Sequence, residues 1–368
     1  MPATPLHALH DAGQSIWLDY IDRTLVRSGE LARRIQGDAL TGMTSNPTIF
    51  EKALAQGTAY DEQLRALAGG RTPWAIFEAV ETDDVRDACD VFRATYDATK
   101  GGDGYVSIEV SPGSAHDAAA TVEEAHRLWA TVGRPNVMIK VPGTDAGCIA
   151  LRRLIADGLN VNVTLLFAVG AHAKVIDAYL AGLEDRAAAG KPLAHVASVA
   201  SFFVSRVDSE VDKRLDAIGT PPALALRGKA AVANARLAYA LFRERFAGPR
   251  WDALAAKGAQ VQRPLWASTG TKNAAYSDVL YVETLIGPHT VNTLPPATLD
   301  AFKDHGKVAR TVDADDAGAK RTIAELEALG IALTAVTDQL LVEGLQAFQK
   351  SFDSLLAGIE SKMGVLGR

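Results

Sequence analysis

The 368-residue sequence predicts an α/β fold, a (β/α)8 barrel with additional helices at the N- and C-termini. Eight short β-type runs alternate with longer stretches of helical spacing, and the length suits one large barrel domain. A doubly wound sheet is the alternative, but it usually has fewer strands and a glycine-rich first turn, which the segment after 15–21 lacks. We expect one domain over 1–368, with 330–366 as a C-terminal helical extension packed on it.

The strands are predicted from short runs rich in β-branched and aromatic residues between turn signals. In chain order these runs are 15–21, 42–46, 104–111, 136–141, 161–167, 195–204, 263–269 and 289–294.

Three helical segments are predicted between and after these strands. One buried face is indicated by apolar residues spaced by four, three and four, namely Val85, Cys89, Phe92 and Tyr96. The stretch 221–247 opens with prolines and is rich in Ala, Leu and Arg, which predicts a long helix. Near the C-terminus a continuous apolar stripe is formed by Leu341, Leu345, Phe348, Phe352, Leu355, Ile359 and Met363. We expect this helix to dock on the barrel exterior; a dimerising coiled coil is the alternative.

The composition argues against several classes of partner. The net charge of -6 disfavours a nucleic-acid or anionic-membrane surface, whereas a local basic pocket could still bind a small anion. The two cysteines, Cys89 and Cys148, form neither a disulfide framework nor a CxxC pair, which indicates a reducing compartment. The first residues lack the pattern of a secretory signal, and no run reaches the roughly 18 apolar residues of a membrane span. We expect a cytoplasmic protein, monomeric or homodimeric.

One lysine stands inside an apolar strand, in "NVMIKVP". Because side chains alternate along a strand, Lys140 shares a face with Met138, while Val137, Ile139 and Val141 share the other. Seven strands repeat this arrangement, with a polar group late in the run. The predicted inward ring is Asp19, Asn46, Glu109, Lys140, Asn162, Thr164, Ser201 and Ser268. Barrel enzymes build their sites at this end, although a hydrogen-bonded polar layer or trapped water is the bland alternative.

The residue types in this inward ring suit a particular kind of catalysis. A lysine in a dry pocket loses its proton readily, and the neutral amine can attack a carbonyl to form a Schiff base. Two carboxylates, Asp19 and Glu109, could carry the protons that such chemistry moves. By pattern alone, a charged lysine that clamps a phosphate is an equal alternative. The eight histidines include no HExxH and no pair at helical ligand spacing, so we expect no metal.

Several motifs in consistent order resemble the transaldolase family, in its longer bacterial form. These are "LTGMTSNPTIF" (40–50), "NVMIKVPGTDAG" (136–147), "NVNVTLLF" (160–167), "ASFFVSRVDSEVDKRL" (200–215) and "LWASTGTKN" (265–273). The resemblance implies a Schiff-base (β/α)8 barrel that needs no cofactor. It moves a dihydroxyacetone unit from sedoheptulose 7-phosphate or fructose 6-phosphate to glyceraldehyde 3-phosphate or erythrose 4-phosphate, in the non-oxidative pentose phosphate pathway.

The resemblance also implies roles for individual residues. Lys140 would form the imine, and Asp19 would be the acid/base for carbon–carbon cleavage. Glu109 and Thr164 would hold a water that shuttles protons. The remaining implied substrate contacts are Asn46, Asn162 and Ser201 for the donor, Phe203 near the acid/base end, and Arg206 with Ser268 for the phosphate.

One departure from the family concerns the phosphate site. Many relatives have Ser-Phe-Arg-Asn where this chain reads "STGTKN", so the second phosphate arginine is missing. Lys272 could supply the charge, as a point contact instead of a bidentate one. Two other functions remain open at this point. One is an aldolase that cleaves fructose 6-phosphate and releases free dihydroxyacetone; the other is a non-catalytic barrel that binds sugar phosphates.

Overall fold

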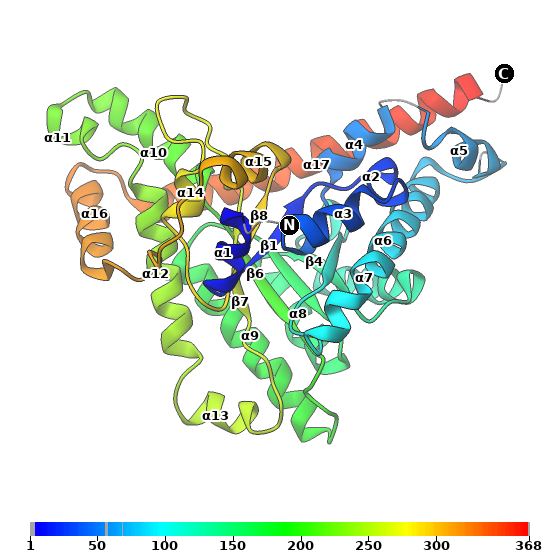
Figure 1. The fold of residues 1–368 in the computed structure, drawn as a ribbon, viewed down its shortest axis with the longest axis horizontal. Helices are drawn as coiled ribbons and strands as arrows, with labels where there is room; N and C mark the ends of the chain where they lie inside the picture. The colour runs from blue at the N-terminus through cyan, green and yellow to red at the C-terminus, as the bar shows by residue number, and fades with distance from the viewer. Residues whose placement is uncertain (1–3, 56–57, 68, 367–368) are drawn as a thin grey trace.

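The computed structural model describes residues 4–55, 58–67 and 69–366, and within them eight parallel strands close into a barrel in chain order (Figure 1). The last strand pairs with the first, so the sheet has no open edge. The strands are β1 (Gln14–Asp19), β2 (Leu40–Thr44), β3 (Tyr105–Glu109), β4 (Val137–Pro142), β5 (Val161–Leu166), β6 (Ser198–Phe203), β7 (Arg263–Ala267) and β8 (Thr290–Leu294). This closure confirms the predicted barrel and excludes a doubly wound sheet.

Every predicted strand coincides with an observed one, but several end earlier. The run 42–46 ends at Thr44 and the run 263–269 ends at Ala267, so Asn46 and Ser268 lie just beyond their strands. The run 195–204 begins its strand only at Ser198. The polar residues at the carboxyl ends therefore belong partly to strands and partly to the loops that follow.

Helices surround the barrel and connect its strands. Those of the first half are α1 (Pro5–Asp11), α2 (Arg23–Arg27), α3 (Glu30–Gly37), α4 (Pro47–Ala55), α5 (Asp61–Leu67), α6 (Pro73–Ala98), the 3-10 turn η1 (Pro112–Ser114), α7 (Ala118–Val132) and α8 (Asp145–Asp157). Those of the second half are α9 (Val169–Ala188), α10 (Ser205–Ile218), α11 (Pro221–Leu224), α12 (Ala230–Arg245), α13 (Pro249–Ala255), α14 (Leu280–Glu283), α15 (Pro296–His305), α16 (Asp316–Ala328) and α17 (Leu333–Leu366).

The helical predictions are confirmed in one case and wrong in another. The face of Val85, Cys89, Phe92 and Tyr96 is buried on α6, as expected. The stretch 221–247 is not one helix, because residues 225–229 form turns between α11 and α12. Gly228 has a left-handed backbone (φ +69°), and a Cβ there would lie 2.9 Å from the ring of Tyr276. The left-handed backbone interrupts the helix here, and the nearby tyrosine ring leaves little room for any side chain at this position.

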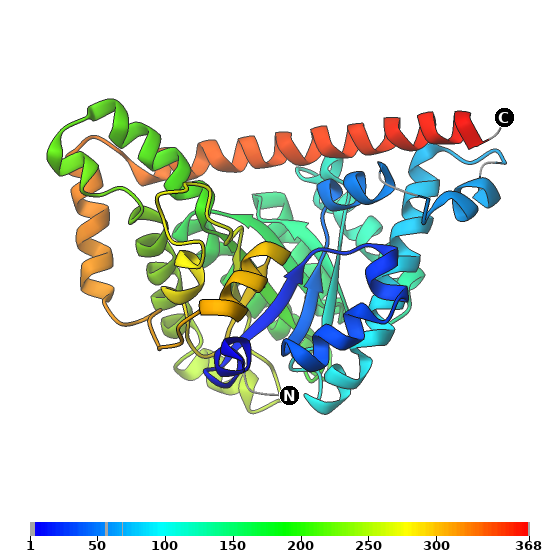
Figure 2. The same cartoon turned by 45° about the horizontal axis from the view of Figure 1, so that its top comes forward.

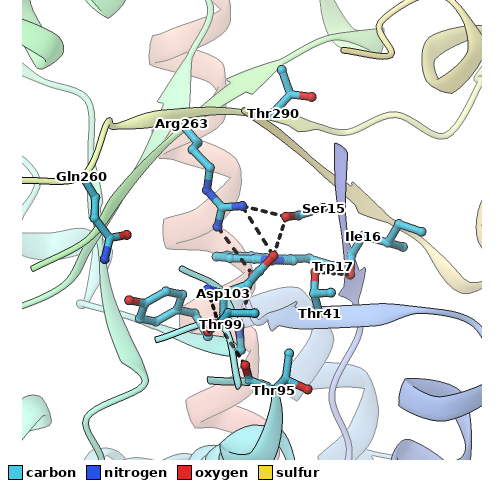
Figure 3. A network of polar contacts seen from close by, with 12 residues as sticks. Ser15, Ile16, Trp17, Thr41, Thr95, Thr99, Asp103, Gln260, Arg263 and Thr290 are labelled. Carbon is cyan, nitrogen blue, oxygen red and sulfur yellow. Dashed lines mark hydrogen bonds and ion pairs between the residues drawn. The ribbon is translucent and has the colours of Figure 1, made fainter. Parts of the chain in front are cut away.

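A polar network fills the amino-terminal end of the barrel (Figure 3). Asp103, just before β3, accepts hydrogen bonds from the hydroxyl of Ser15 and from Nε1 of Trp17, the latter at 2.8 Å. Arg263 at the start of β7 donates to Ser15 Oγ at 2.6 Å and pairs with Asp103 at 3.4 Å. This cluster joins β1, β7 and the entry to β3, at the end of a barrel where residues serve stability.

A layer of bulky side chains separates this network from the opposite end. Trp17 is fully buried, and Gly42 on the neighbouring strand makes room for it. A Cβ at Gly42 would lie 2.4 Å from Trp17 Nε1, which no other residue could tolerate. The indole thus fills the barrel interior below the polar ring, and the polar side chains above it lie at the carboxyl ends of the strands.

The long helix α17 crosses the carboxyl-terminal mouth of the barrel, from α10 and α16 at one side to α4, α5 and α6 at the other (Figure 2). It packs on the barrel over this mouth and does not join the outer ring of helices. Phe348, Phe352, Leu355 and Ile359 of the predicted stripe are buried beneath it. Trp74 and Phe77 of α6 hold Phe352 edge to face, with ring centroids 5.0 and 5.9 Å apart.

Among the described residues, no single helix has the length and apolar character to cross a membrane. Taken together, α16 and α17 have the length and composition of a membrane span, but the two helices are bent by 89° relative to each other.

Candidate active site

A cavity of about 430 Å³ lies at the carboxyl-terminal mouth of the barrel, beneath α17. Nine of the eleven side chains predicted from the sequence line it. Five come from strands: Asp19, Lys140, Thr164, Ser201 and Phe203. Four follow strands or begin helices: Asn46, Arg206, Ser268 and Lys272. The other two, Glu109 and Asn162, lie directly behind this lining and contact it.

Lys140 points into this cavity and is almost fully buried, with 6% of its surface exposed. Its Nζ lies 3.1 Å from Oε2 of Glu109 on the neighbouring strand and donates to the backbone carbonyl of Ser45, also at 3.1 Å. The ring centroid of Phe348 from α17 lies 5.8 Å away. The amine thus lies between one carboxylate that can take up its proton, one backbone carbonyl and one aromatic ring, and its remaining side faces the cavity.

The chain after Lys140 turns sharply into α8, and this turn fixes the end of β4. Thr144 caps the helix, accepting a hydrogen bond from the backbone N–H of Gly147 at 3.0 Å. A Cβ at Gly147 would lie only 1.9 Å from the carbonyl oxygen of Pro142. Gly147, the last residue of "VPGTDAG", therefore lets the helix start close against the strand that carries the lysine.

Glu109 is the acidic partner of Lys140, and its side chain is 6% exposed. The two residues are opposite each other in the β3–β4 register, so strand pairing itself brings them together. Burial raises the pKa of Glu109, the adjacent Lys140 charge lowers it, and repulsion from Asp19 raises it. Burial prevails, so this carboxylate accepts a proton more readily than an exposed glutamate.

Asp19 occupies the end of β1, across the cavity lining from Lys140. Its Oδ1 accepts a hydrogen bond from the hydroxyl of Thr44 at 3.0 Å, and Thr44 lies 2.9 Å from the hydroxyl of Thr293 on β8. Burial raises the pKa of Asp19, while Lys140, the Thr44 hydrogen bond and Lys272 lower it. This balance suits a group that must take up and release a proton.

Asn162 does not reach the cavity directly. It is fully buried, and its Oδ1 accepts a hydrogen bond from Ser201 Oγ at 2.6 Å, while its Nδ2 donates to Ser107 Oγ at 3.0 Å. Ser201 is therefore the member of this pair that faces a ligand. Thr164, which does line the cavity, has a buried hydroxyl without a hydrogen-bond partner among the described residues.

The strand β5 departs from regular alternation at Leu165. This residue has a left-handed backbone (φ +60°), and the β5–β6 register shifts at the same place. Its side chain lies at the mouth, where a Cβ on Gly344 of α17 would be 3.0 Å from it. Strand alternation alone would place Leu165 on the outer face with Val161 and Val163, but the bulge turns it toward α17.

Asn46 is held by the helix that follows it. Its side-chain oxygen accepts a hydrogen bond from the backbone N–H of Ile49 at 3.1 Å, as at a helix N-terminus, and Pro47 starts α4. The amide nitrogen is left for the cavity that the residue lines. The Asn-Pro pair in the sequence thus has a local structural cause as well as a place in the site.

Cationic side chains surround the open part of the cavity. Arg206 lies at the start of α10, with its Cζ 5.4 Å from the ring centroid of Phe203, and burial lowers its pKa. Ser268 has a left-handed backbone (φ +56°), and its hydroxyl lies 3.0 Å from that of Ser205. Lys272 lies beyond it in the same loop and is exposed. Lys52 of α4 adds a cation that the sequence did not single out.

Four further residues of the site were also not predicted. Ser45 supplies the carbonyl that holds the amine, Thr44 holds Asp19, and Thr293 contacts Thr44. The signals for Ser45 and Thr44 lay within the "TSN" motif, whereas nothing marked Thr293. Phe348 was placed in the apolar stripe, but the pattern could not tell that it faces Lys140.

No group of three or more His, Cys, Asp or Glu side chains is placed to hold a metal ion in the described part of the chain. The charged groups near Lys140 are two carboxylates and several cations, a set that moves protons and binds anions.

Comparison with known proteins gives a consistent result. A sequence profile described as "Transaldolase/Fructose-6-phosphate aldolase" matches residues 16–359. A protein named "Transaldolase" from Parafrankia sp. (strain EAN1pec) is 51% identical over 362 residues, 98% of both chains. "Transaldolase" from Mycolicibacterium smegmatis is 50% identical over 360 residues, 97% of both chains. "Transaldolase 1" from Streptomyces coelicolor is 51% identical over 367 residues, 99% of this chain and 96% of its own.

Proposed function

Since this chain belongs to the transaldolase/fructose-6-phosphate aldolase family, we propose that it catalyses the transaldolase reaction through a Schiff base on Lys140. It moves a dihydroxyacetone unit from a ketose phosphate to an aldose phosphate, as a transferase of the non-oxidative pentose phosphate pathway. The observation that carries the proposal is the position of Lys140 Nζ, 3.1 Å from a buried carboxylate and open to a cavity of about 430 Å³.

The first step is formation of the imine. Glu109 takes a proton from the Lys140 ammonium across 3.1 Å, and the neutral amine adds to the ketose carbonyl. The resulting hydroxyl then leaves as water. The raised pKa of Glu109 supports a role in holding a water that shuttles these protons, as does the hydroxyl of Thr164, which has no hydrogen-bond partner in the described part of the chain.

The second step is carbon–carbon cleavage. Asp19 removes the proton of the C4 hydroxyl, the C3–C4 bond breaks, and the iminium takes up the electron pair. Thr44 orients the carboxylate, and its hydrogen bond at 3.0 Å leaves the other oxygen for substrate. An aldose phosphate departs, and the three-carbon unit stays bound to Lys140 until a second aldose phosphate accepts it.

The remaining predicted residues bind the substrate. Asn46 and Ser201 hydrogen-bond the dihydroxyacetone hydroxyls, and Asn162 acts by orienting Ser201 through the 2.6 Å bond. Arg206, Ser268 and Lys272 bind the phosphate, and Phe203 packs against Arg206. We propose sedoheptulose 7-phosphate and fructose 6-phosphate as donors, and glyceraldehyde 3-phosphate and erythrose 4-phosphate as acceptors.

We also propose that the chain works in the cytoplasm as a monomer or homodimer and forms one domain over 1–368, with 330–366 as its helical extension. Of that span, residues 1–3, 56–57, 68 and 367–368 lie outside the described residues. Cell fractionation, sedimentation at several concentrations and limited proteolysis are the respective tests.

The test of the reaction is borohydride reduction in the presence of fructose 6-phosphate, followed by peptide mass mapping. We expect a stable adduct on Lys140 that is lost in Lys140→Ala and retained in Lys52→Ala, a second lysine of the same cavity. An unmodified Lys140 in the wild-type protein would contradict the proposal. Turnover with and without an acceptor aldose phosphate separates the transferase from an aldolase, because dihydroxyacetone released without acceptor would favour the aldolase.

A further inference from the structure

A second, small cavity lies behind Glu109, on the side away from the substrate. It measures about 10 Å³, the size that admits a single water molecule. Carboxylates of Glu81, Glu109 and Glu124 contribute to its lining, together with Ser111. Phe352 of α17 and Trp74 of α6 close it on the apolar side.

Glu81 is the unusual member of this group. It lies on α6, 5% exposed, and makes no hydrogen bond or ion pair with the described residues. Its neighbours are satisfied. Glu124 accepts from the backbone N–H of Ser111 at 3.1 Å and from its hydroxyl at 2.7 Å, and Glu78 pairs with Arg127.

The electrostatics explain how a lone carboxyl group can be buried there. Burial raises the pKa of Glu81 well above the ordinary value, and repulsion from Glu109 is the next cause. Glu124 and Glu78 add to the repulsion, and Lys140 opposes it. Burial and repulsion thus both favour the protonated form of Glu81, which can donate a proton that a glutamine cannot.

Imine formation moves two protons, and such a group can take part in their transfer. The ammonium of Lys140 starts with three hydrogens and the iminium keeps one, so two protons pass to the oxygen that leaves as water. Glu109 can hold only one of these at a time. A second acid behind it lets both transfers proceed without proton exchange through the cavity that the sugar phosphate fills.

We propose that Glu81 is a positioning residue that acts through Glu109 as its proton reservoir, by way of one water in the small cavity. The inference rests on the proposed function. Glu81 gives its proton to the Glu109 carboxylate as Glu109 protonates the substrate oxygen during addition, and regains a proton from Glu109 when the Lys140 nitrogen passes its second proton to Glu109. Glu109 then protonates the hydroxyl, which leaves as water. The cycle closes without net gain or loss of protons.

The test is rapid-quench borohydride trapping with fructose 6-phosphate in wild type, Glu81→Gln, Glu81→Leu and the control Glu78→Gln. We expect imine formation to slow about tenfold in Glu81→Gln, less than the ~100-fold typical of removing a direct acid–base group. The Michaelis constant should stay unchanged, and the solvent deuterium isotope effect on trapping should increase. Glu78→Gln, on the same helix and the same cavity lining, should trap at the wild-type rate.

Glutamine keeps the size and the neutral polar character of the protonated acid, which separates proton transfer from structure. A wild-type trapping rate in Glu81→Gln would overturn the inference, whether or not Glu81→Leu is impaired or folds. Absence of any adduct in the wild-type protein would instead refute the proposed function, and the reservoir with it.

Discussion

Replacing the buried His172 with leucine should make the protein more resistant to acid. His172 lies on α9, is fully buried, and has its ring centroid 5.9 Å from that of Phe202. Neither ring nitrogen has a hydrogen-bond partner among the described residues. Burial therefore disfavours the charged form and lowers the pKa of His172 from 6.5 to about 4.

The sign and size of the effect follow from proton linkage. Between pH 6.5 and pH 4 the unfolded chain binds a proton that the folded chain does not, so the free energy of unfolding falls as the pH falls through this window. At pH 5, about 1.5 pH units below the pKa of the unfolded histidine, protonation of the unfolded chain lowers the free energy of unfolding by about 2 kcal/mol. His172→Leu removes this loss.

The assay is urea unfolding at pH 7.5 and pH 5, followed by circular dichroism. The decrease in unfolding free energy between the two pH values should be about 2 kcal/mol smaller in His172→Leu than in wild type. Any packing change made by leucine is the same at both pH values and cancels. His116→Leu, at an exposed position, controls for the loss of one histidine. An unaltered pH dependence in His172→Leu would refute the reasoning.

Three further predictions concern the site and the barrel floor. Arg206→Ala should raise the Michaelis constant for fructose 6-phosphate about tenfold or more, since a charged hydrogen bond contributes ~1.5–3 kcal/mol, and Lys272→Ala should raise it less; unchanged constants would remove both residues from the phosphate site. Asp19→Asn should slow turnover much more than borohydride trapping, and equal losses would mean that Asp19 does not act in cleavage. Asp103→Ala should lower the free energy of unfolding by about 3 kcal/mol, because Arg263, whose side chain is only 15% exposed, loses its carboxylate partner, while the turnover of the folded enzyme is unchanged. A reduced turnover number would show that the floor of the barrel influences its mouth.

The part of the site built on regular strands was predictable from the sequence. Alternation placed Lys140 and Glu109 on the inward face, and strand pairing puts Glu109 opposite Lys140 and Lys140 opposite Asn162. Parallel strands that are neighbours in the chain carry their late residues to one level. The alternation of side chains along the strands therefore predicted which residues point into the barrel and how far along its axis they lie.

The pattern failed where the backbone departs from regular geometry. Leu165 keeps the spacing of an outward residue, but its positive φ turns it to the mouth, and no local signal in "VNVTLLF" marks the bulge. Asn162 was correctly placed inward, yet its hydrogen bond to Ser201 depends on side-chain geometry that the period cannot specify.

Contacts between distant segments were beyond local patterns as well. Asp103 contacts Trp17, 86 residues away in the sequence, and Arg263, 160 residues away. In the sequence, Asp103 and Arg263 look like ordinary charged residues. Phe348 belongs to a regular apolar stripe, which indicates a buried face without saying what covers it. Glu81 stands in the acidic run "VETDD", where a solvated helix face is the natural expectation.

The aromatic roof over Lys140 has a consequence for how the enzyme is made. A ribosome releases the chain from its amino end, so all eight strands emerge before α17. Lys140, Glu109 and the cationic residues proposed to bind phosphate can therefore come together before Phe348 has been synthesised. During that interval the mouth of the nascent barrel is uncovered, and Lys140 gains its aromatic neighbour only when translation reaches the crossing helix.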